Sequence, residues 1–458
     1  MIRSRGAERL PPPRPATSRG WTPATKARIP TRRPSRKRPR PRYPRTSGKG
    51  TVLSTSTSTR AEDLRNALVD KIVAGHVRQG LTMRAEVERA LRKVPRELFT
   101  PGVPLEEAYR DGAVITKRSA DGVNLSSVSA PYLIAEMLGQ AKGRHVLEIG
   151  SGGYNAALLR EIAGPGGSVL TVDIDQEVTD RARACLDTAG YSDVEVVCAD
   201  AEFEIEPGRG FDLIEVTVGA WDIPPAWISQ LAEGGTLVVP LRTLGMTRSW
   251  ALRRAGNHLV STSNLLCGFV PMQGEGASKG RSVPLGDGVT LWLNEHQQDI
   301  DGDPVAAVFS QERHEARSGV TVPSGRLSAD LDLWLATHLP NFGLMITELA
   351  AIDNGLVVPS WRFGTPAFVD GATLAYRGKL RQVDDTTTEF EYVVYAHGPD
   401  AARLAEQMAD QIRAWDRAGR PTSTLCVFSI GTPDADLPDG MVLDKKHTRL
   451  VFTWPTAK

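Results

Sequence analysis

Apolar residues recur at helical spacing near the start of the chain, within residues 61–97. Charged residues fill the positions between them, a pattern that is typical of amphipathic helices. The apolar positions are Leu64, Leu68, Ile72, Val87, Leu91 and Val94. Because proline disfavours helix in the residue before it, the second helix should end at Val94, in front of Pro95. The pattern therefore predicts two helices that pack ahead of the main domain.

Between residues 130 and 275, short apolar runs alternate with helical patterns. The runs of strand length are 145–149, 168–173, 194–198, 211–216 and 235–240. The helical segments around them are 132–138, opened by Pro131, then 154–163, 175–189 and 225–232. Strands and helices that alternate at this spacing predict a parallel sheet with helices on both faces. The expected fold class is α/β, with a doubly wound, Rossmann-like sheet.

The pattern changes after residue 280. Strand-like runs follow one another at 289–293, 305–309, 372–377, 388–396, 424–430 and 447–454, and helical periodicity returns at 327–338 and 399–418. This mixture predicts an α+β C-terminal domain over 280–458, beside a main domain over 61–279. The apolar face of helix 399–418 consists of Leu404, Met408, Ile412 and Trp415. Such a face, with strand edges, is an ordinary means of holding a peptide, and a stabilising or dimerising appendage is the alternative.

Charge is distributed unevenly, although the formal net charge is only +1. Residues 1–50 hold 16 Lys and Arg, one acid and 10 of the 31 prolines. Such a segment cannot bury apolar surface, so 1–60 is expected to be a disordered basic tail that ends in a Ser/Thr-rich linker at 51–60. A polybasic arm, a transit peptide and a translated upstream region are alternative explanations of the tail. The remaining residues carry a net charge of −14, which argues against nucleic-acid binding by the folded part.

Cysteine, histidine and hydropathy patterns exclude several other classes of protein. The four cysteines form no CxxC pair, and the eight histidines form no HxxxH or HExxH pattern. A disulfide scaffold and a metal centre are therefore not expected. No run approaches the roughly 18 apolar residues that a transmembrane helix needs, so the chain is expected to have no membrane span and to be cytoplasmic.

The most informative stretch is the turn after the first predicted strand, which reads EIGSGG from Glu148 to Gly153. A glycine-rich turn between a strand and a helix lets a ligand approach the backbone closely, at the carboxyl ends of the parallel strands. Asp173 ends the second strand, where a carboxylate can accept hydrogen bonds from ribose hydroxyls, and Asp200 follows the third strand, where it would lie near an adenine. This arrangement serves dinucleotides and S-adenosyl-L-methionine, and an ordinary turn with unrelated acids is the plain alternative. Asn155 stands where a dinucleotide fingerprint needs its third glycine, which weakens the nicotinamide interpretation.

Eight segments between residues 94 and 245 carry a more specific signal. They read VPRELF, AYRDG, SVSAPYLIAEML, VLEIGSGGYNAALL, VDID, CADA, FDLIEVTVGAWDIPPAWISQL and GGTLVVPL. In this order they resemble the protein-L-isoaspartate O-methyltransferase family. The resemblance implies a class I methyltransferase fold that uses S-adenosyl-L-methionine to methylate a carboxylate of a peptide or protein bearing an Asp or isoaspartate. The cofactor-binding residues that it implies are Glu148, Gly150, Ser151, Gly152, Asn155, Asp173, Ile174, Asp200 and Ala201.

The chain departs from this family in two ways. The family's loop reads EIG-T/S-G-S-G-YNAA, whereas this chain has one residue fewer, and about 180 residues follow the predicted catalytic domain. Both features resemble the lanthipeptide-associated methyltransferases named for an FxLD motif in their peptides. That resemblance implies methylation of an unmodified Asp in a ribosomally made peptide, after which the ester closes to an aspartimide. Repair of isoaspartate in aged proteins is the alternative within the family, and a non-catalytic binding or scaffold protein is the alternative of another class.

The catalytic candidates lie on SVSAP, which matches the family's T-I-S-x-P active-site loop. A carboxylate is already a nucleophile at neutral pH, so methyl transfer needs alignment and a dry site rather than a strong base. Ser129, Ser127 and, after the fourth strand, Thr217 are expected to position the carboxylate. Capping of helix 132–138 is the structural alternative for the two serines.

Two further groups of residues have competing interpretations. The cluster of Trp221, Trp227 and Pro224-Pro225 suits a peptide-binding wall, and buried packing is its alternative. His447 lies beside two lysines at the start of a predicted strand, where we expect a solvated turn rather than a catalytic histidine.

Overall fold

The structure is a computed structural model that describes residues 51–150, 152–278, 280–293, 308–324, 329–384 and 388–455. The predicted tail of residues 1–50 lies outside the described residues. The linker predicted at 51–60 is wrong, because the first helix already begins at Thr51. Extending a helix that has formed costs far less than starting one, so the helix can continue back through a Ser/Thr-rich segment.

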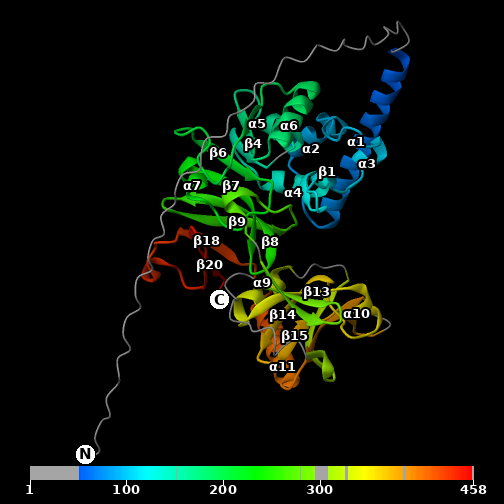
Figure 1. Cartoon of the computed structure of the whole chain (residues 1–458), viewed down its shortest axis with the longest axis vertical. Helices are drawn as coiled ribbons and strands as arrows, with labels where there is room; N and C mark the ends of the chain where they lie inside the picture. Colours follow the sequence, from blue (N-terminus) through cyan, green and yellow to red (C-terminus); the bar gives the residue numbers. More distant parts are fainter. Residues whose placement is uncertain are drawn as a thin grey trace, which may run out of the picture. The chain divides into compact units, whose positions relative to one another are not determined.

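The N-terminal part consists of helices and one short hairpin (Figure 1). Its elements are α1 (Thr51–Arg78), α2 (Ala85–Lys93), η1 (Arg96–Phe99), α3 (Leu105–Ala108), β1 (Val114–Arg118), β2 (Asn124–Val128) and α4 (Pro131–Gln140). The two predicted helices are therefore confirmed, and the second ends before Val94 as Pro95 requires. The hairpin β1–β2 is antiparallel and leads directly to α4.

The predicted parallel sheet forms one half of a ten-stranded sheet. Its elements are β3 (His145–Ile149), α5 (Tyr154–Ala163), β4 (Ser168–Asp173), α6 (Gln176–Ala189), β5 (Glu195–Cys198), β6 (Phe211–Val216), α7 (Pro225–Gln230) and β7 (Leu231–Thr243). The parallel strands lie in the order β5–β4–β3–β6–β7. The chain thus starts in the middle at β3, moves out to β5 and returns to the other side of β3, which is the doubly wound order. The turn after β3 consequently lies where the winding reverses, the usual place for a ligand.

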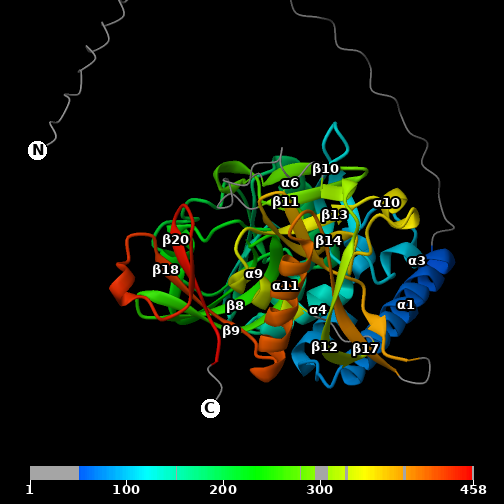
Figure 2. The ribbon, with the colours of Figure 1, turned by 90° about the horizontal axis from the view of Figure 1, so that it is seen from below.

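The other half of this sheet is antiparallel and corrects the predicted domain boundary. It consists of β8 (Met246–Ala255), β9 (His258–Leu266), β18 (Thr424–Ser429), β20 (Thr448–Thr453) and β19 (Met441–Asp444), with η5 (Asp434–Asp436) between β18 and β19. β18 pairs with β9 through Val427 and Leu259, and Figure 2 shows the red strands β18 and β20 beside the green strands β8 and β9. Residues 280–458 are therefore not one separate domain, because their last strands complete the first sheet.

A second, eight-stranded sheet is formed by residues between β9 and β18. Its strands are β10 (Arg281–Gly286), β11 (Val289–Leu293), β12 (His314–Pro323), β13 (Phe342–Thr347), β14 (Phe363–Asp370), β15 (Thr373–Arg377), β16 (Arg381–Gln382) and β17 (Glu389–His397). The remaining elements are η2 (Gly274–Gly276), η4 (Val308–Ser310), α9 (Ala329–His338), α10 (Leu349–Asp353) and α11 (Ala401–Arg417). The strand predicted at 305–309 is not seen, since 305–307 lie outside the described residues and 308–310 form a 3-10 turn. The α+β prediction otherwise holds for this part.

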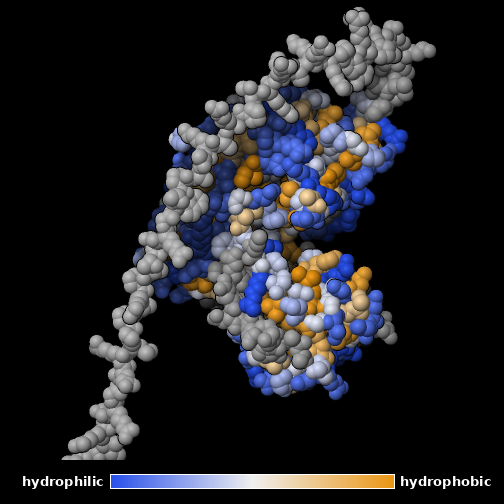
Figure 3. Space-filling view, in the orientation of Figure 1, coloured by the Kyte–Doolittle hydropathy of each residue, from blue (hydrophilic) through white to orange (hydrophobic). Residues whose placement is uncertain are grey.

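The apolar face of α11 is not available to a peptide, contrary to the hypothesis drawn from its sequence. Leu404, Met408, Ile412 and Trp415 are all buried, and they pack in the core with residues of β12, β15 and β17. An amphipathic helix is stable only when its apolar stripe is covered, and here the second sheet covers it. Apolar side chains are instead exposed elsewhere in this part, at Leu349, Trp361 and Phe363. Figure 3 shows orange patches among hydrophilic residues over the region where Figure 1 labels β13, β14 and α10.

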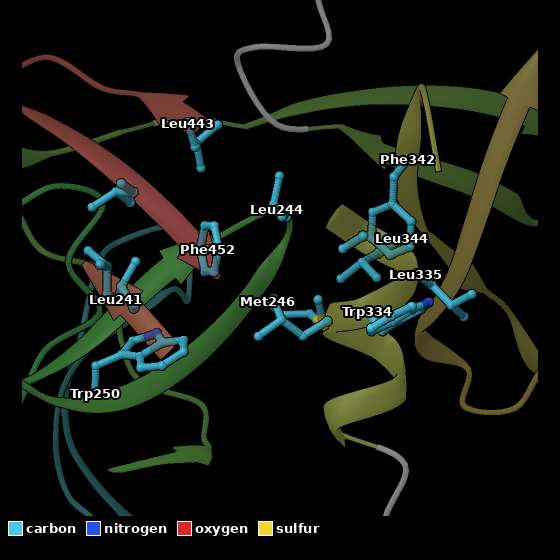
Figure 4. Close-up of a cluster of buried hydrophobic side chains, with 14 of the residues drawn as sticks. Leu241, Leu244, Met246, Trp250, Trp334, Leu335, Phe342, Leu344, Leu443 and Phe452 are labelled. Atoms are coloured by element: carbon cyan, nitrogen blue, oxygen red, sulfur yellow. The ribbon is translucent and has the colours of Figure 1, made fainter. Parts of the chain in front are cut away.

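Alternating residues of the central strands serve two different cores, because successive side chains point to opposite faces. On one face Val146, Val169 and Leu213 pack with α1, α2, α4, α5 and α6. On the other face Leu147, Leu170 and Ile214 pack in the core that includes Trp227 of α7. Figure 4 shows this second core continuing from Trp250 and Phe452 to Trp334 and Leu344. Within the described ranges no helix is long and apolar enough to cross a bilayer.

Candidate functional site

Two hollows open at the carboxyl ends of the parallel strands, and Gly150 lines both of them. The serine hollow holds about 420 Å³ of space, part of it open to solvent, and is lined by Ser127, Val128, Ser129, Ile134, Met137, Gly150, Gly152, Tyr154, Asn155, Glu215, Thr217 and Phe269. The aspartate hollow holds about 400 Å³, also partly open to solvent, and is lined by Leu125, Ile149, Gly150, Val172, Asp173, Ile174, Ala199, Asp200, Ala201, Val218, Pro271, Met272 and Gln273. Most of the predicted site residues are therefore brought together around one glycine turn.

The backbone of the turn after β3 adopts conformations that favour glycine. Gly150 has φ +91°, and a Cβ there would lie 2.5 Å from Val218 Cγ1, so a side chain would fill the joint between the hollows. Gly153 has φ +96° and precedes α5 as its N-cap residue. Gly152 lines the serine hollow. Ser151, predicted to bind the cofactor, lies outside the described residues.

Asp173 ends β4 and lines the aspartate hollow. Its Oδ1 accepts the backbone N–H of Asp175 at 2.9 Å, whereas its Oδ2 has no hydrogen-bond partner among the residues that the structure describes. Burial raises the pKa of Asp173 to about 6, although the hydrogen bond from Asp175 opposes the shift. The position and the free acceptor both suit a pair of ribose hydroxyls, as the sequence predicts.

Asp200 holds a short strap, residues 271–275, over the aspartate hollow. Its Oδ1 accepts the N–H of Glu202 at 2.9 Å, and its Oδ2 accepts the N–H of Glu275 at 3.1 Å. Gly274 has φ +76°, and a Cβ there would lie 2.3 Å from Asp200 Oδ2, so only glycine allows this approach. The strap was missed from sequence, because a Gly-Glu-Gly segment has no hydrophobic periodicity that would place it against a strand end.

The two predicted serines share the serine hollow and are not helix caps. Ser127 and Ser129 lie two residues apart on an extended segment, which puts their side chains on the same side. α4 begins at Pro131 with Ala130 as its N-cap residue, and no side chain caps it. The capping alternative is therefore wrong, and in the described part of the chain neither hydroxyl has a hydrogen-bond partner.

Thr217 also lines this hollow, but its hydroxyl proton is already used. Its Oγ1 donates to the carbonyl oxygen of Ile149 at 2.9 Å. Thr217 consequently offers lone pairs to a ligand rather than a proton, which makes it a poorer partner for a carboxylate than the serines.

Arg96 anchors the segment that carries the serines. It is 0% exposed, and it donates to the carbonyl oxygens of Ala108, Gly112 and Val128 at 2.8, 3.2 and 3.3 Å. Its guanidinium also lies 5.1 Å from the centre of the Tyr154 ring, which lines the serine hollow. Val128 stands between the two serines, so this arginine fixes their backbone. The VPRELF segment contains it, but sequence alone gives no sign of its partners.

A pair of acids lies beneath the serine hollow. Glu148 of β3 and Glu215 of β6 are direct neighbours in the parallel ladder, and both are buried. Asn155 Nδ2 donates to Glu148 Oε1 at 2.9 Å and to Glu215 Oε2 at 3.4 Å. Burial raises the pKa of Glu215 to about 8, and the charge of Glu148 adds to the shift. Glu215 was not predicted as a site residue. Its one signal in the sequence is that it is an acid inside the apolar run FDLIEV.

The turn around His447 is only partly solvated: Lys446 is exposed, as predicted, whereas the His447 side chain is largely covered. Lys446 Nζ and His447 Nε2 contact Glu202 Oε1 at 3.0 and 2.8 Å, and the backbone N–H of His447 donates to Asp222 at 2.6 Å. Lys445 is buried and donates to the carbonyl oxygen of Arg242 at 2.7 Å. The strands β19 and β20 carry this turn back onto the loops that follow β5 and β6. His447 lines neither hollow, so it supports the site indirectly, through its contact with Glu202.

The tryptophan cluster is mainly packing. Trp227 is buried and its Nε1–H donates to the carbonyl oxygen of Ala201 at 2.7 Å. Trp221 is half-buried, and Lys445 Nζ lies 4.5 Å from its ring centre. For Trp227 the buried alternative is confirmed.

Comparisons with known proteins identify the relatives of the chain. The sequence profile described as protein-L-isoaspartate(D-aspartate) O-methyltransferase (PCMT) matches residues 66–277. The chain is 35% identical to protein-L-isoaspartate O-methyltransferase 2 of Archaeoglobus fulgidus over 44% of this chain and 92% of that protein. It is also 35% identical to the enzyme of that name from Korarchaeum cryptofilum, over 44% of this chain and 96% of that protein. The solved structure of a beta-aspartate methyltransferase (PCMT) from Plasmodium falciparum with S-adenosyl-L-homocysteine is 16% identical, covers 46% of this chain and 98% of that one, and has a TM-score of 0.39.

Both sequence relatives are matched over more than nine tenths of their own length. The profile match over residues 66–277 includes the glycine turn and the two hollows. The fold is that of the class I methyltransferases, and the cofactor is S-adenosyl-L-methionine. The chain belongs to the protein-L-isoaspartate O-methyltransferase family, whose members are S-adenosyl-L-methionine-dependent carboxyl methyltransferases.

Proposed function

We propose that this enzyme methylates the free carboxylate of an isoaspartyl residue in a peptide or protein. The observation that carries the proposal is the serine hollow, where two hydroxyls without a hydrogen-bond partner among the described residues face a space that adjoins the aspartate hollow at Gly150. Hydroxyl donors suit a carboxylate, since hydrogen bonds to a charged acceptor are the stronger ones. The relatives that match the chain carry the same activity in their names.

The residues present fit S-adenosyl-L-methionine. Asp173 offers a carboxylate oxygen for the ribose, the strap and Ala201 enclose the space beside it, and Gly150 keeps the passage between the hollows clear. When bound, this cofactor supplies an electrophilic methyl group. The protein's own task is then to hold the substrate carboxylate in line with that group and to exclude water.

The chain can perform this task without a general base. The substrate oxygen forms a bond to the methyl carbon while the sulfur–carbon bond breaks, and sulfur keeps the electron pair, so no proton has to move. Ser127 and Ser129 orient the carboxylate, and Ile134, Met137 and Phe269 supply apolar walls. The products are a methyl ester and S-adenosyl-L-homocysteine.

Two matched peptides test the proposal. One carries isoaspartate at a single position and the other carries Asp at that position, and both are incubated with enzyme and cofactor before mass spectrometry. We expect the isoaspartyl peptide to gain one methyl group and the Asp peptide to stay unchanged. A non-catalytic binding protein would leave both peptides unchanged, which would contradict the proposal.

Methylation of an unmodified Asp in a ribosomally made peptide is the second candidate function. One feature that favours it, besides the shortened loop after β3, lies beyond residue 277, where the family match ends. The second sheet exposes Trp361 and Phe363, whose rings lie 5.8 Å apart, and Arg362 lies 4.0 Å from the Phe363 ring centre. Such a surface suits a longer peptide. In this case the Asp peptide should gain a methyl group and then show a net loss of one water, as the next backbone nitrogen attacks the ester and closes the ring.

A pair of serine variants tests the proposed role of Ser129. Ser129→Ala should lower kcat/KM by about tenfold to a hundredfold, because a hydrogen bond to a charged group contributes about 1.5–3 kcal/mol. Cofactor affinity and melting temperature should stay nearly unchanged, since this serine caps no helix. Ser126 is the matched control, because its hydroxyl accepts hydrogen bonds from Thr116 and Arg181 and lines neither hollow. Ser126→Ala should lower the melting temperature and leave kcat nearly intact, and the reverse pattern would contradict both assignments.

Ionisation of the Asp173 carboxyl group should make cofactor binding depend on pH. Its carboxylate accepts hydrogen bonds only when ionised, and burial raises its pKa to about 6. Affinity for S-adenosyl-L-homocysteine should therefore be constant above this pH and should fall below it, by up to about tenfold per pH unit. Calorimetry on wild type and Asp173→Asn measures the effect. The variant should bind more weakly at neutral pH and lose the dependence, and an identical dependence in both proteins would exclude Asp173 as its origin.

A further inference from the structure

Glu215 is a buried acid in the serine hollow with one oxygen unused. It is 1% exposed and lines the hollow together with Ser127 and Ser129. Its Oε2 receives the long hydrogen bond from Asn155, whereas its Oε1 has no hydrogen-bond partner within the described residues. A buried polar atom without a partner costs free energy, so such an atom at the wall of a binding site points to a ligand.

The surroundings of Glu215 favour its neutral form. Glu148 is its neighbour on β3, and it is the one charged group among the described residues that shifts Glu215. Asn155 faces it from α5, Val238 adjoins it on β7, and the walls from α4 are apolar. Burial, strengthened by the charge of Glu148, raises the pKa of Glu215 to about 8. Glu215 therefore carries a proton on most molecules at pH 7.

We propose that Glu215 binds the carboxylate of the substrate directly, by donating a hydrogen bond from its own protonated carboxyl group. An acid that an apolar site keeps neutral can donate in this way at neutral pH. The ionised form of Glu215 would instead repel the substrate carboxylate, and Glu148 beside it would add to the repulsion. The inference rests on the proposed function and deepens it, because it adds a third donor, from β6, to Ser127 at the end of β2 and Ser129 just after it.

The competing role for Glu215 is binding of the cofactor's ammonium group, which would need the ionised form. The two roles predict opposite behaviour. A donor to the substrate affects kcat/KM for the peptide and leaves cofactor affinity alone, whereas an acceptor from the cofactor affects the dissociation constant of S-adenosyl-L-homocysteine.

The test is the pH profile of kcat/KM for the peptide that the wild type methylates, measured from about pH 6.5 to 9.5 with saturating cofactor. The protonated fraction of Glu215 falls as pH rises through its pKa, so wild-type kcat/KM should fall at least about tenfold above pH 8. Glu215→Gln keeps an N–H donor and cannot titrate, so its profile should lose most of this fall. Glu215→Ala has no donor and should lose about tenfold to a hundredfold at pH 7, part of which the glutamine variant recovers.

A second glutamate provides the matched control. Glu195 on β5 pairs with Arg209 and lines neither hollow. Glu195→Gln should keep the alkaline fall, which separates the loss of one titrating glutamate from the loss of this particular one. Calorimetry should give the same affinity for S-adenosyl-L-homocysteine, within about twofold, in all four proteins.

Three other outcomes would contradict either the inference or the proposed function. An active wild type whose alkaline fall persists in Glu215→Gln contradicts the inference and leaves the proposed function standing. Weaker S-adenosyl-L-homocysteine binding in both Glu215 variants assigns the residue to the cofactor and likewise contradicts the inference. A wild type that methylates neither peptide contradicts the proposed function, and the inference falls with it.

Discussion

A chain truncated after residue 279 should fail to fold into a stable enzyme. The truncation removes β18 and β20, which place Leu425, Val427, Leu450 and Phe452 fully buried in the core beside the large sheet. Losing one large buried side chain costs about 2–5 kcal/mol. Four such losses match or exceed the roughly 5–15 kcal/mol that stabilise a typical domain. Circular dichroism during heating should show no cooperative transition, and the truncated chain should not bind S-adenosyl-L-homocysteine.

The control is a chain that lacks the second sheet but keeps the last strands. Residues 281–421 are replaced by a flexible linker, so that β18, β19 and β20 remain. This chain should unfold cooperatively and bind the cofactor product more tightly than the truncated one. If the chain that ends at residue 279 unfolds cooperatively and binds as well as the full protein, the last strands are not needed for the fold.

Replacing Arg96 with methionine should lower the free energy of unfolding by about 3 kcal/mol or more. Methionine has a similar length, but it leaves two buried carbonyl oxygens and one partly buried carbonyl oxygen without their donor, and each buried loss costs about 1–3 kcal/mol. Because one of these carbonyls belongs to Val128, kcat should fall as well. Urea unfolding followed by fluorescence measures the first effect.

Arg92 is the matched control for this substitution. It is partly exposed and pairs with Asp70 and Glu88 at the surface. Exposed ion pairs contribute about 0–1 kcal/mol, so Arg92→Met should change stability by about 1 kcal/mol or less. Equal losses in the two variants would mean that the buried carbonyl contacts of Arg96 do not carry the effect.

The local pattern of the sequence predicts the parallel half of the fold well, because each strand and helix there shows the hydrophobic periodicity of its own type. The strand ends also place Asp173 and Asp200 correctly. The return of β18 to β9 could not be predicted, since Val427 and Leu259 are far apart along the chain and pairing between distant strands leaves no local signal. The boundary at 280 was placed at a change of pattern that does not coincide with the end of the sheet.

The candidate site likewise has residues that the sequence predicts and residues that it does not. Ser127 and Ser129 follow from a matching segment, and the structure adds that they cap nothing. Arg96 and Glu215 were not predicted as site residues because their roles depend on burial and on partners from other elements. A charged residue in a sequence is ordinarily read as exposed, and it is the packing of the sheet that makes these two exceptions.

The position of β18, β19 and β20 after the second sheet in chain order has a consequence for the order of folding. A ribosome synthesises the N-terminal side first, so a growing chain contains β9 as an unpaired edge until residues 424–453 have emerged. The Lys445–His447 turn that steadies Glu202 arrives equally late. We therefore expect the second sheet to form before the methyltransferase sheet closes. Translation products that stop before β18 would then lack a finished aspartate hollow, so activity should require that β18 and β20 have been made.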